Sequence, residues 1–215
     1  MNTLQDRIRG SLIGGAIGDA LGYPVEFMSR KAILRKYGDR GIMRFELDKS
    51  GKALVSDDTQ MTLFTANGLL NWWDNENRLS GAPLSSFVEN AYLDWYYTQT
   101  GETRVNANGK ERHSTWLYSL PELAHRRAPG TTCMSACESI LAGEWPLNNS
   151  KGCGGIMRVA PLGLLQAAYI AKNGECLMNE AHLAANGANI ARITHLHPLG
   201  YLPAALLALV ISRIV

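Results

Sequence analysis

The sequence predicts an all-α protein that folds as a single domain. Apolar residues recur every three or four positions along most of the chain, which is the period of a helix. The alternating apolar pattern of an extensive sheet is missing. The 215 residues are 46% hydrophobic and 19% charged, which is enough to bury a core without disulfides. No stretch has the composition of a linker between domains.

Composition and charge exclude several classes of protein. Lys and Arg number 21 against 19 Asp and Glu, a net charge of +2, so we expect no strong attraction to nucleic acid. The four cysteines form no C-x-x-C pair, which argues against a zinc knuckle or a dithiol redox site. The N-terminus lacks the apolar region of a signal peptide, and the most apolar stretch, residues 202–211, is too short to span a membrane. We therefore expect a soluble, cytoplasmic protein.

The first predicted helix carries an unusual number of glycines. Apolar residues repeat with a period of four between residues 4 and 21, and four glycines spaced four apart run from Gly10 to Gly22. Each glycine in a helix interior costs about 1 kcal/mol relative to alanine. We therefore expect a neighbouring helix to approach this glycine face closely. Pro24 ends the helix and places Glu26 in the following loop.

Helical periodicity continues along the rest of the chain. One long helix is expected to begin near Asp58, and another to surround Phe87 to Trp95 and to end before Gly101, a typical helix-ending residue. Gly, Asn, Lys and Arg make residues 103–112 an expected exposed loop. The remaining predicted helices cover residues 132–141, 161–171, 179–193 and 202–215.

The run Ser56-Asp57-Asp58-Thr59 precedes an apolar helix and has two interpretations. Ser, Asp and Thr are preferred N-cap residues, and acids are favourable near the positive end of a helix. Two adjacent carboxylates between two hydroxyls exceed what capping requires, however, and they repel each other unless a cation is bound. Such oxygen donors suit Mg²⁺ or Mn²⁺ rather than zinc.

Two further runs could contact a ligand. The glycines of residues 151–158 precede a helix, so their backbone amides could hold a phosphate. The run lacks the P-loop spacing, and a tightly packed turn is the alternative. His195 and His197 are two residues apart and do not share a helix face. One histidine contacting a ligand is therefore favoured over a metal-binding pair.

Together these motifs closely resemble one family. They read G-S-L-I-G-G-A-I-G-D-A-L-G-Y-P-V-E-F-M at 10–28, S-D-D-T-Q-M at 56–61, K-G-C-G-G-I-M-R at 151–158 and A-R-I-T-H-L-H-P at 191–198. In this order and spacing they resemble the ADP-ribosylglycohydrolases, which include the dinitrogenase-reductase-activating glycohydrolase. The resemblance implies a compact orthogonal helical bundle that holds two Mg²⁺ or Mn²⁺ ions. It also implies hydrolysis of the bond between ADP-ribose and a protein side chain, so that ADP-ribose or an ADP-ribosylated protein is the expected partner.

The resemblance assigns roles to the acidic residues. Ser56, Asp57 and Asp58 match the family's first metal-ligand triplet, and both aspartates are therefore expected to serve catalysis. Glu26 matches the loop acid near the scissile bond, where it would act on water or on the leaving group. Departure from a ribose anomeric carbon passes through an oxocarbenium-like state, and metal ions can orient the ribose hydroxyls.

The resemblance also assigns the substrate contacts. Gly154, Gly155 and Met157 match the loop that surrounds the ribose and diphosphate, and His195 matches a histidine that contacts ADP-ribose. Cys153 stands where the family often has Asn, and we expect this to remove one polar contact.

One family motif is missing. Family members carry a second acidic motif, G-G-D-x-D-T, which completes the metal sites, and residues 1–215 contain none. The chain ends at Val215 within an apolar predicted helix, so we expect a domain that is incomplete at its C-terminus. Two alternatives to a hydrolase therefore stay open: a non-catalytic ADP-ribose-binding module and an inactive fragment of such an enzyme.

Overall fold

The computed structural model describes residues 3–74 and 81–215 and confirms the all-α class. Within these residues there are no strands, and the only pairings of the β type are two isolated bridges, Leu47 with Ala53 and Val105 with Glu111. The helices are α1 (Leu4–Gly22), α2 (Arg30–Tyr37), α3 (Asp57–Asp74), α4 (Leu84–Thr100), α5 (Thr131–Leu141), α6 (Ala160–Asn173), α7 (Glu180–Arg192) and α8 (Pro198–Ile214), with short 3₁₀ turns η1 (Tyr23–Val25), η3 (Trp116–Ser119) and η4 (Cys153–Gly155).

The observed helix ends follow local chemistry. Gly101 adopts a left-handed conformation with φ of 75° and ends α4, as expected. Helix α8 begins at Pro198, four residues earlier than predicted. Proline is well suited to the first turn of a helix, because the amide hydrogen it lacks would have no partner there. Helix α2 was not predicted: it has eight residues, none of them buried, and its apolar face spans only Ile33 to Tyr37, which is too short to stand out as a period.

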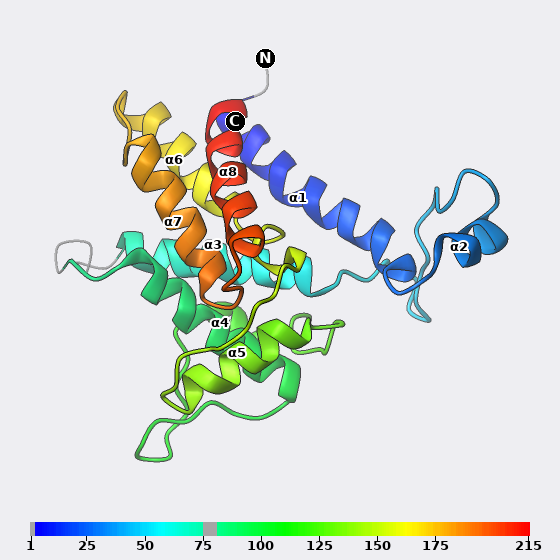
Figure 1. Cartoon of the computed structure of the whole chain (residues 1–215), viewed down its shortest axis with the longest axis horizontal. Coiled ribbons are helices and arrows are strands. Elements are labelled where there is room, and N and C mark those ends of the chain that lie inside the picture. The colour runs from blue at the N-terminus through cyan, green and yellow to red at the C-terminus, as the bar shows by residue number, and fades with distance from the viewer. Residues whose placement is uncertain (1–2, 75–80) are drawn as a thin grey trace.

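Helices α3 to α8 form the body of the protein. In Figure 1, α6, α7 and α8 lie together on one side of α3 and α4, and α1 extends away from them toward α2. The first turn of α1 lies beside the end of α8, where Arg7 donates a 3.0 Å hydrogen bond to the Val215 carbonyl. The largest fully buried side chains come from α3, α4, α6 and α7 and from the segment just before α6; they include Trp95, Tyr92, Phe64, Met61, Leu162, Leu183, Ile190 and Arg158.

Small residues set the distances between these helices. A Cβ atom added at Gly163 of α6 would lie 2.6 Å from the Ala208 carbonyl oxygen of α8. One added at Gly187 of α7 would lie 3.0 Å from Ala205 Cα, and one at Gly68 of α3 only 2.8 Å from Val88 Cα of α4. These backbones approach one another so closely that no larger residue fits without a shift.

The expected close approach to the glycine face of α1 is wrong. No heavy atom of the described residues lies within 4 Å of a Cβ atom added at Gly10, Gly14, Gly18 or Gly22. Ala20 is the one buried residue of the helix. The period of four located the stripe correctly, but a periodic pattern does not reveal whether the space beside it holds a helix or a cavity.

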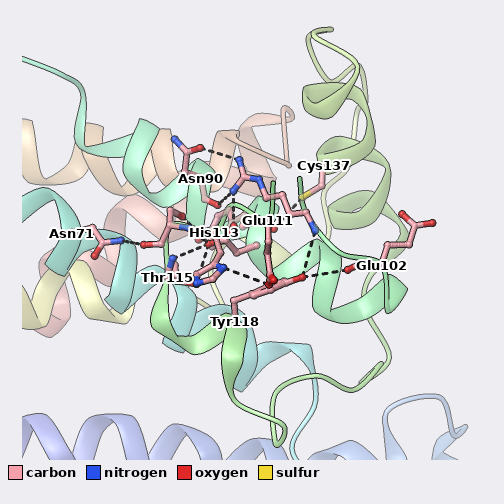
Figure 2. Close-up of polar contacts among 12 residues, drawn as sticks. Asn71, Asn90, Glu102, Glu111, His113, Thr115, Tyr118 and Cys137 are labelled. Atoms are coloured by element: carbon pink, nitrogen blue, oxygen red, sulfur yellow. Dashed lines mark hydrogen bonds and ion pairs between the residues drawn. The ribbon is translucent and has the colours of Figure 1, made fainter. Parts of the chain in front are cut away.

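A buried carboxylate fastens the loop between α4 and η3. Asp94 is fully buried and accepts hydrogen bonds from the backbone amides of Ser114 at 2.6 Å and Thr115 at 2.8 Å. Arg104 contacts the other carboxylate oxygen at 2.5 Å and the carbonyl of Asn90 at 3.2 Å. Figure 2 shows Asn90 and Thr115 converging on this junction. Asp94 therefore anchors both ends of the 103–112 loop, and the loop itself is largely exposed, as predicted.

One segment has the composition of a membrane span but packs as a core helix. The stretch Cys153–Asn173 is long and apolar enough to cross a membrane, with a mean hydropathy of 1.2. Half of its most apolar window is buried inside the protein, and Arg158 within it is fully buried. Burial against α3 and α8 accounts for its apolar composition.

Candidate active site

A cavity of about 490 Å³ lies where α1, α3 and residues 151–158, here called the glycine loop, meet. Four of the predicted site residues line it, namely Glu26, Ser56, Asp58 and Met157. The exposed glycine face of α1 forms part of its wall, together with Cys153. Three segments that are far apart in the sequence therefore contribute to one site, and the α1 glycines, which have no side chains, leave space in it.

The start of α3 is held in place by capping and by a distant loop. Ser56 Oγ accepts a 3.1 Å hydrogen bond from the Asp58 amide, which is the predicted capping contact. The Asp57 amide donates to the Arg127 carbonyl at 2.9 Å, and one Asp57 carboxylate oxygen accepts from the Gly130 amide at 3.1 Å. Asp57 is buried and turned toward this loop, whereas Asp58 lines the cavity.

Asp19 joins α1 to α3 and was not predicted as a site residue. Its Oδ2 accepts hydrogen bonds from the Ser56 amide at 2.9 Å and the Thr59 amide at 3.2 Å. The Thr59 hydroxyl donates to the same oxygen at 2.5 Å. The available signal was an acid within residues 12–22, which are otherwise apolar or glycine, but its partners lie 37 and 40 residues away.

The site concentrates negative charge. The pKa of Asp57 is raised to about 7, mainly by burial; the hydrogen bond from Gly130 opposes this rise, and the carboxylates of Asp58 and Glu26 add to it. Burial, with Asp19 and Glu26 nearby, raises the pKa of Asp58 to about 6. Burial and the charge of Asp19 also raise the pKa of Glu26. No Lys or Arg is among the residues that line the cavity.

The glycine loop is packed rather than free. A Cβ atom added at Gly155 would lie 2.5 Å from the Gly200 carbonyl oxygen and 2.8 Å from Ala191 Cβ. The tight-turn interpretation therefore explains Gly155, which is buried. Cys153 and Met157 reach the cavity, so the loop still contributes one wall of the site.

His195 lies under the glycine loop rather than on the cavity surface. The residue is 3% exposed, and a Cβ atom added at Gly154 would lie 2.4 Å from its Cε1 and 2.9 Å from its Nε2. Burial, together with the charge of Arg158, lowers the pKa of His195 to about 4. The ring is therefore neutral at ordinary pH. His197 instead caps α8, with its Nδ1 accepting from the Leu199 amide at 3.0 Å.

Comparison with known proteins decides the family. A family model described as ADP-ribosylglycohydrolase matches residues 1–215. The chain belongs to the ADP-ribosylglycohydrolase family. An uncharacterized protein of Archaeoglobus fulgidus is 27% identical over 166 residues, covering 75% of this chain and 44% of that protein. The chain therefore spans less than half the length of that curated relative.

The donor atoms in this cavity are of the type that a hard divalent ion prefers. Asp58, Glu26 and the hydroxyl of Ser56 offer oxygen atoms to one cavity, and oxygen is the preferred ligand of Mg²⁺ and Mn²⁺. Their carboxylates have no cationic side chain beside them in the cavity wall. Within residues 3–74 and 81–215, however, no three His, Cys, Asp or Glu side chains are close enough to hold an ion together.

Proposed function

We propose that this chain carries the active site of a metal-dependent hydrolase that removes ADP-ribose from modified protein side chains or related conjugates. The observation that carries the proposal is the cavity itself. It brings the carboxylates of Glu26 and Asp58 together with Cys153 and Met157 of the glycine loop. Family membership supports the ADP-ribosyl type of glycohydrolase.

Glu26 is proposed to handle the proton. Hydrolysis at an anomeric carbon needs a carboxylate that takes a proton from water, or a carboxylic acid that gives one to the leaving group. The pKa of Glu26 is raised by burial and by the charge of Asp19, which brings it nearer the pH at which such a group works best. Its position after η1, at the edge of the cavity, leaves it accessible to a substrate.

We propose that Ser56, Asp57 and Asp58 hold Mg²⁺ or Mn²⁺. A bound divalent ion would supply positive charge that activates water and orients the ribose hydroxyls. Asp58 and Ser56 line the cavity, and Asp57 has one carboxylate oxygen engaged by Gly130. A cation would also relieve the repulsion that contributes to the raised pKa values of the two aspartates.

The remaining family residues are proposed to hold the nucleotide. Met157 would contact the ribose from the cavity wall, while Gly154 and Gly155 shape the backbone that would face the diphosphate. His195 lies directly beneath this backbone. A cytoplasmic location suits a substrate of this kind and stays part of the proposal.

A non-catalytic ADP-ribose-binding module is the second candidate. The observation in its favour is that the described residues do not assemble three side chains able to hold an ion. In that case the glycine loop and His195 would bind the nucleotide, and the acidic residues would not achieve turnover.

One assay separates the two candidates. It measures release of ADP-ribose from a panel of modified peptides with Mg²⁺, with Mn²⁺ and with a chelator. A hydrolase releases ADP-ribose with the metal and not with the chelator, whereas a binding module gives affinity for ADP-ribose in calorimetry without release. If the chain neither releases nor binds ADP-ribose, both candidates are rejected.

Glu26→Gln supplies the test of the proton-handling residue. We expect loss of turnover of at least a hundredfold, in line with the usual contribution of general acid–base catalysis, with ADP-ribose affinity retained. The matched control is Glu122→Gln, which makes the same change at an exposed position outside the cavity. Equal turnover in the two variants would remove Glu26 from the chemistry.

A further inference from the structure

Arg158 is a fully buried cation without a carboxylate partner among the described residues. Its side chain is 0% exposed and makes none of the salt bridges in the described part of the chain. One guanidinium nitrogen lies 3.4 Å from Met61 Sδ and 3.5 Å from Cys133 Sγ. The guanidinium also lies 4.3 Å from the centre of the Tyr92 ring. A buried charge with such weak partners is costly. The other terminal guanidinium nitrogen makes a shorter contact, and this contact indicates the role of Arg158.

That short contact is with Thr194. Arg158 donates to Thr194 Oγ1 at 2.7 Å and, from the same nitrogen, to the Ile190 carbonyl at 3.3 Å. Thr194 Oγ1 in turn lies 2.8 Å from His195 Nδ1. Arg158, Thr194 and His195 therefore form a chain of three polar groups that leads from the centre of the core to the glycine loop.

The chemistry of the groups fixes the first of these directions. A guanidinium only donates, so Thr194 Oγ1 accepts from Arg158. The Thr194 hydroxyl still has its own proton to donate, and we assign His195 Nδ1, 2.8 Å away, as the acceptor of that proton. An Nδ1 that accepts leaves the proton of a neutral imidazole on Nε2.

The Nε2 side of the ring faces the glycine loop. A Cβ atom added at Gly152 would lie 3.3 Å from Nε2, and one at Gly154 would lie 2.9 Å from it. Among the described residues, Nε2 has no hydrogen-bond partner, although it points at the backbone that borders the cavity.

We propose that Arg158 is a positioning residue that, through Thr194, fixes His195 in its neutral Nε2–H tautomer and so directs a donor at the glycine loop that would receive a phosphate of the bound nucleotide. The ligand part rests on the proposed function, because it assumes that the loop receives a diphosphate. The low pKa of His195 agrees with this arrangement, since a neighbouring guanidinium and burial both oppose a second proton. The ring then donates at all ordinary pH values without becoming charged.

The tautomer can be read directly by NMR. Long-range ¹H–¹⁵N spectra of the histidine-labelled chain distinguish Nδ1–H from Nε2–H, and His195 is assigned by removing the other four histidines one at a time. We expect the Nε2–H form in the wild type. A wild-type Nδ1–H tautomer would overturn the proposal.

The variant pair Thr194→Val and Thr194→Ser tests the connection. Valine keeps the shape but lacks the hydroxyl, so we expect a mixture of tautomers and about tenfold weaker ADP-ribose binding in calorimetry, the effect of one net hydrogen bond. Serine retains the hydroxyl and should match the wild type in both measurements. An unchanged tautomer in Thr194→Val would overturn the relay, and an altered tautomer with unchanged affinity would overturn the ligand contact.

Arg158→Met provides a second route. Methionine retains much of the packing volume but lacks the hydrogen-bond donors. If Arg158 acts through the Thr194 hydroxyl, the His195 tautomer mixture in Arg158→Met should equal that in Thr194→Val. If the wild type binds no ADP-ribose, the proposed function fails, while the NMR result still decides whether Arg158 and Thr194 set the tautomer.

Discussion

Replacing Gly14 of α1 by alanine is expected to stabilise the protein. No heavy atom of the described residues lies within 4 Å of a Cβ atom added there, so the change introduces no clash. Glycine in a helix interior costs about 1 kcal/mol relative to alanine, and that cost would be removed. In a chain of this size, about 1 kcal/mol corresponds to about 2–4 °C in melting temperature. Thermal unfolding followed by circular dichroism would detect such a rise.

The same substitution at Gly163 of α6 is the matched control. There the new Cβ atom would lie 2.6 Å from the Ala208 carbonyl oxygen and 2.7 Å from Ile211 Cβ. Overpacking of this kind costs about 1–3 kcal/mol, which outweighs the gain in helix propensity. A melting temperature that falls for both variants would refute the open face of α1, because Gly14 would then be in contact with a neighbour as Gly163 is.

Three further perturbations test the site. Gly154→Ala should push the ring of His195 aside, because the added Cβ would lie 2.4 Å from its Cε1. Calorimetry should then show ADP-ribose binding weakened by about tenfold or more, and full affinity would contradict this. The pKa values of Asp57 and Asp58 are about 7 and about 6, against 3.8 ordinarily, so the folded state binds more protons than the unfolded state. In the absence of metal, the free energy of unfolding measured in urea should therefore fall as pH rises from about 4 to about 7. Saturating Mg²⁺ should remove much of that fall. Asp19→Ala removes three hydrogen bonds from the start of α3 and should lower the free energy of unfolding by about 2–3 kcal/mol in urea titrations; a loss below about 0.5 kcal/mol would show that they contribute little.

The helices of the core could be predicted because their periodic faces are buried. Residues such as Phe64 of α3 and Leu162 of α6 have no exposed surface, and a buried stripe of this kind leaves its spacing in the sequence. Helix α2 buries no residue and has only eight, so its apolar face is too short to reveal a period. Its signals are local instead, namely Ser29, whose hydroxyl caps it at 3.2 Å, and Gly38, whose positive φ follows it.

The site could be predicted only in part, because its residues are recognisable one motif at a time. The acids of residues 56–58 stood out by type and position, whereas Glu26 was assigned a role only through the family resemblance. Asp19 did not, because its function is to bind backbone amides that follow long after it in the chain. In the sequence, Arg158 is only the last residue of the 151–158 motif. Its burial between Met61 and Thr194 shows that it belongs to the core.

The small residues between α7 and α8 have a consequence for how this sequence can vary. Gly187 faces Ala205 Cα at a distance that admits no further atom, so these two positions specify a separation between helix axes rather than an amount of apolar surface. An enlargement at one position is tolerated only if the other helix retreats, and α8 also packs against Gly163 of α6. The three helices are therefore expected to change in concert among relatives, whereas Leu202 and Leu206 on the exposed side of α8 are free to change singly.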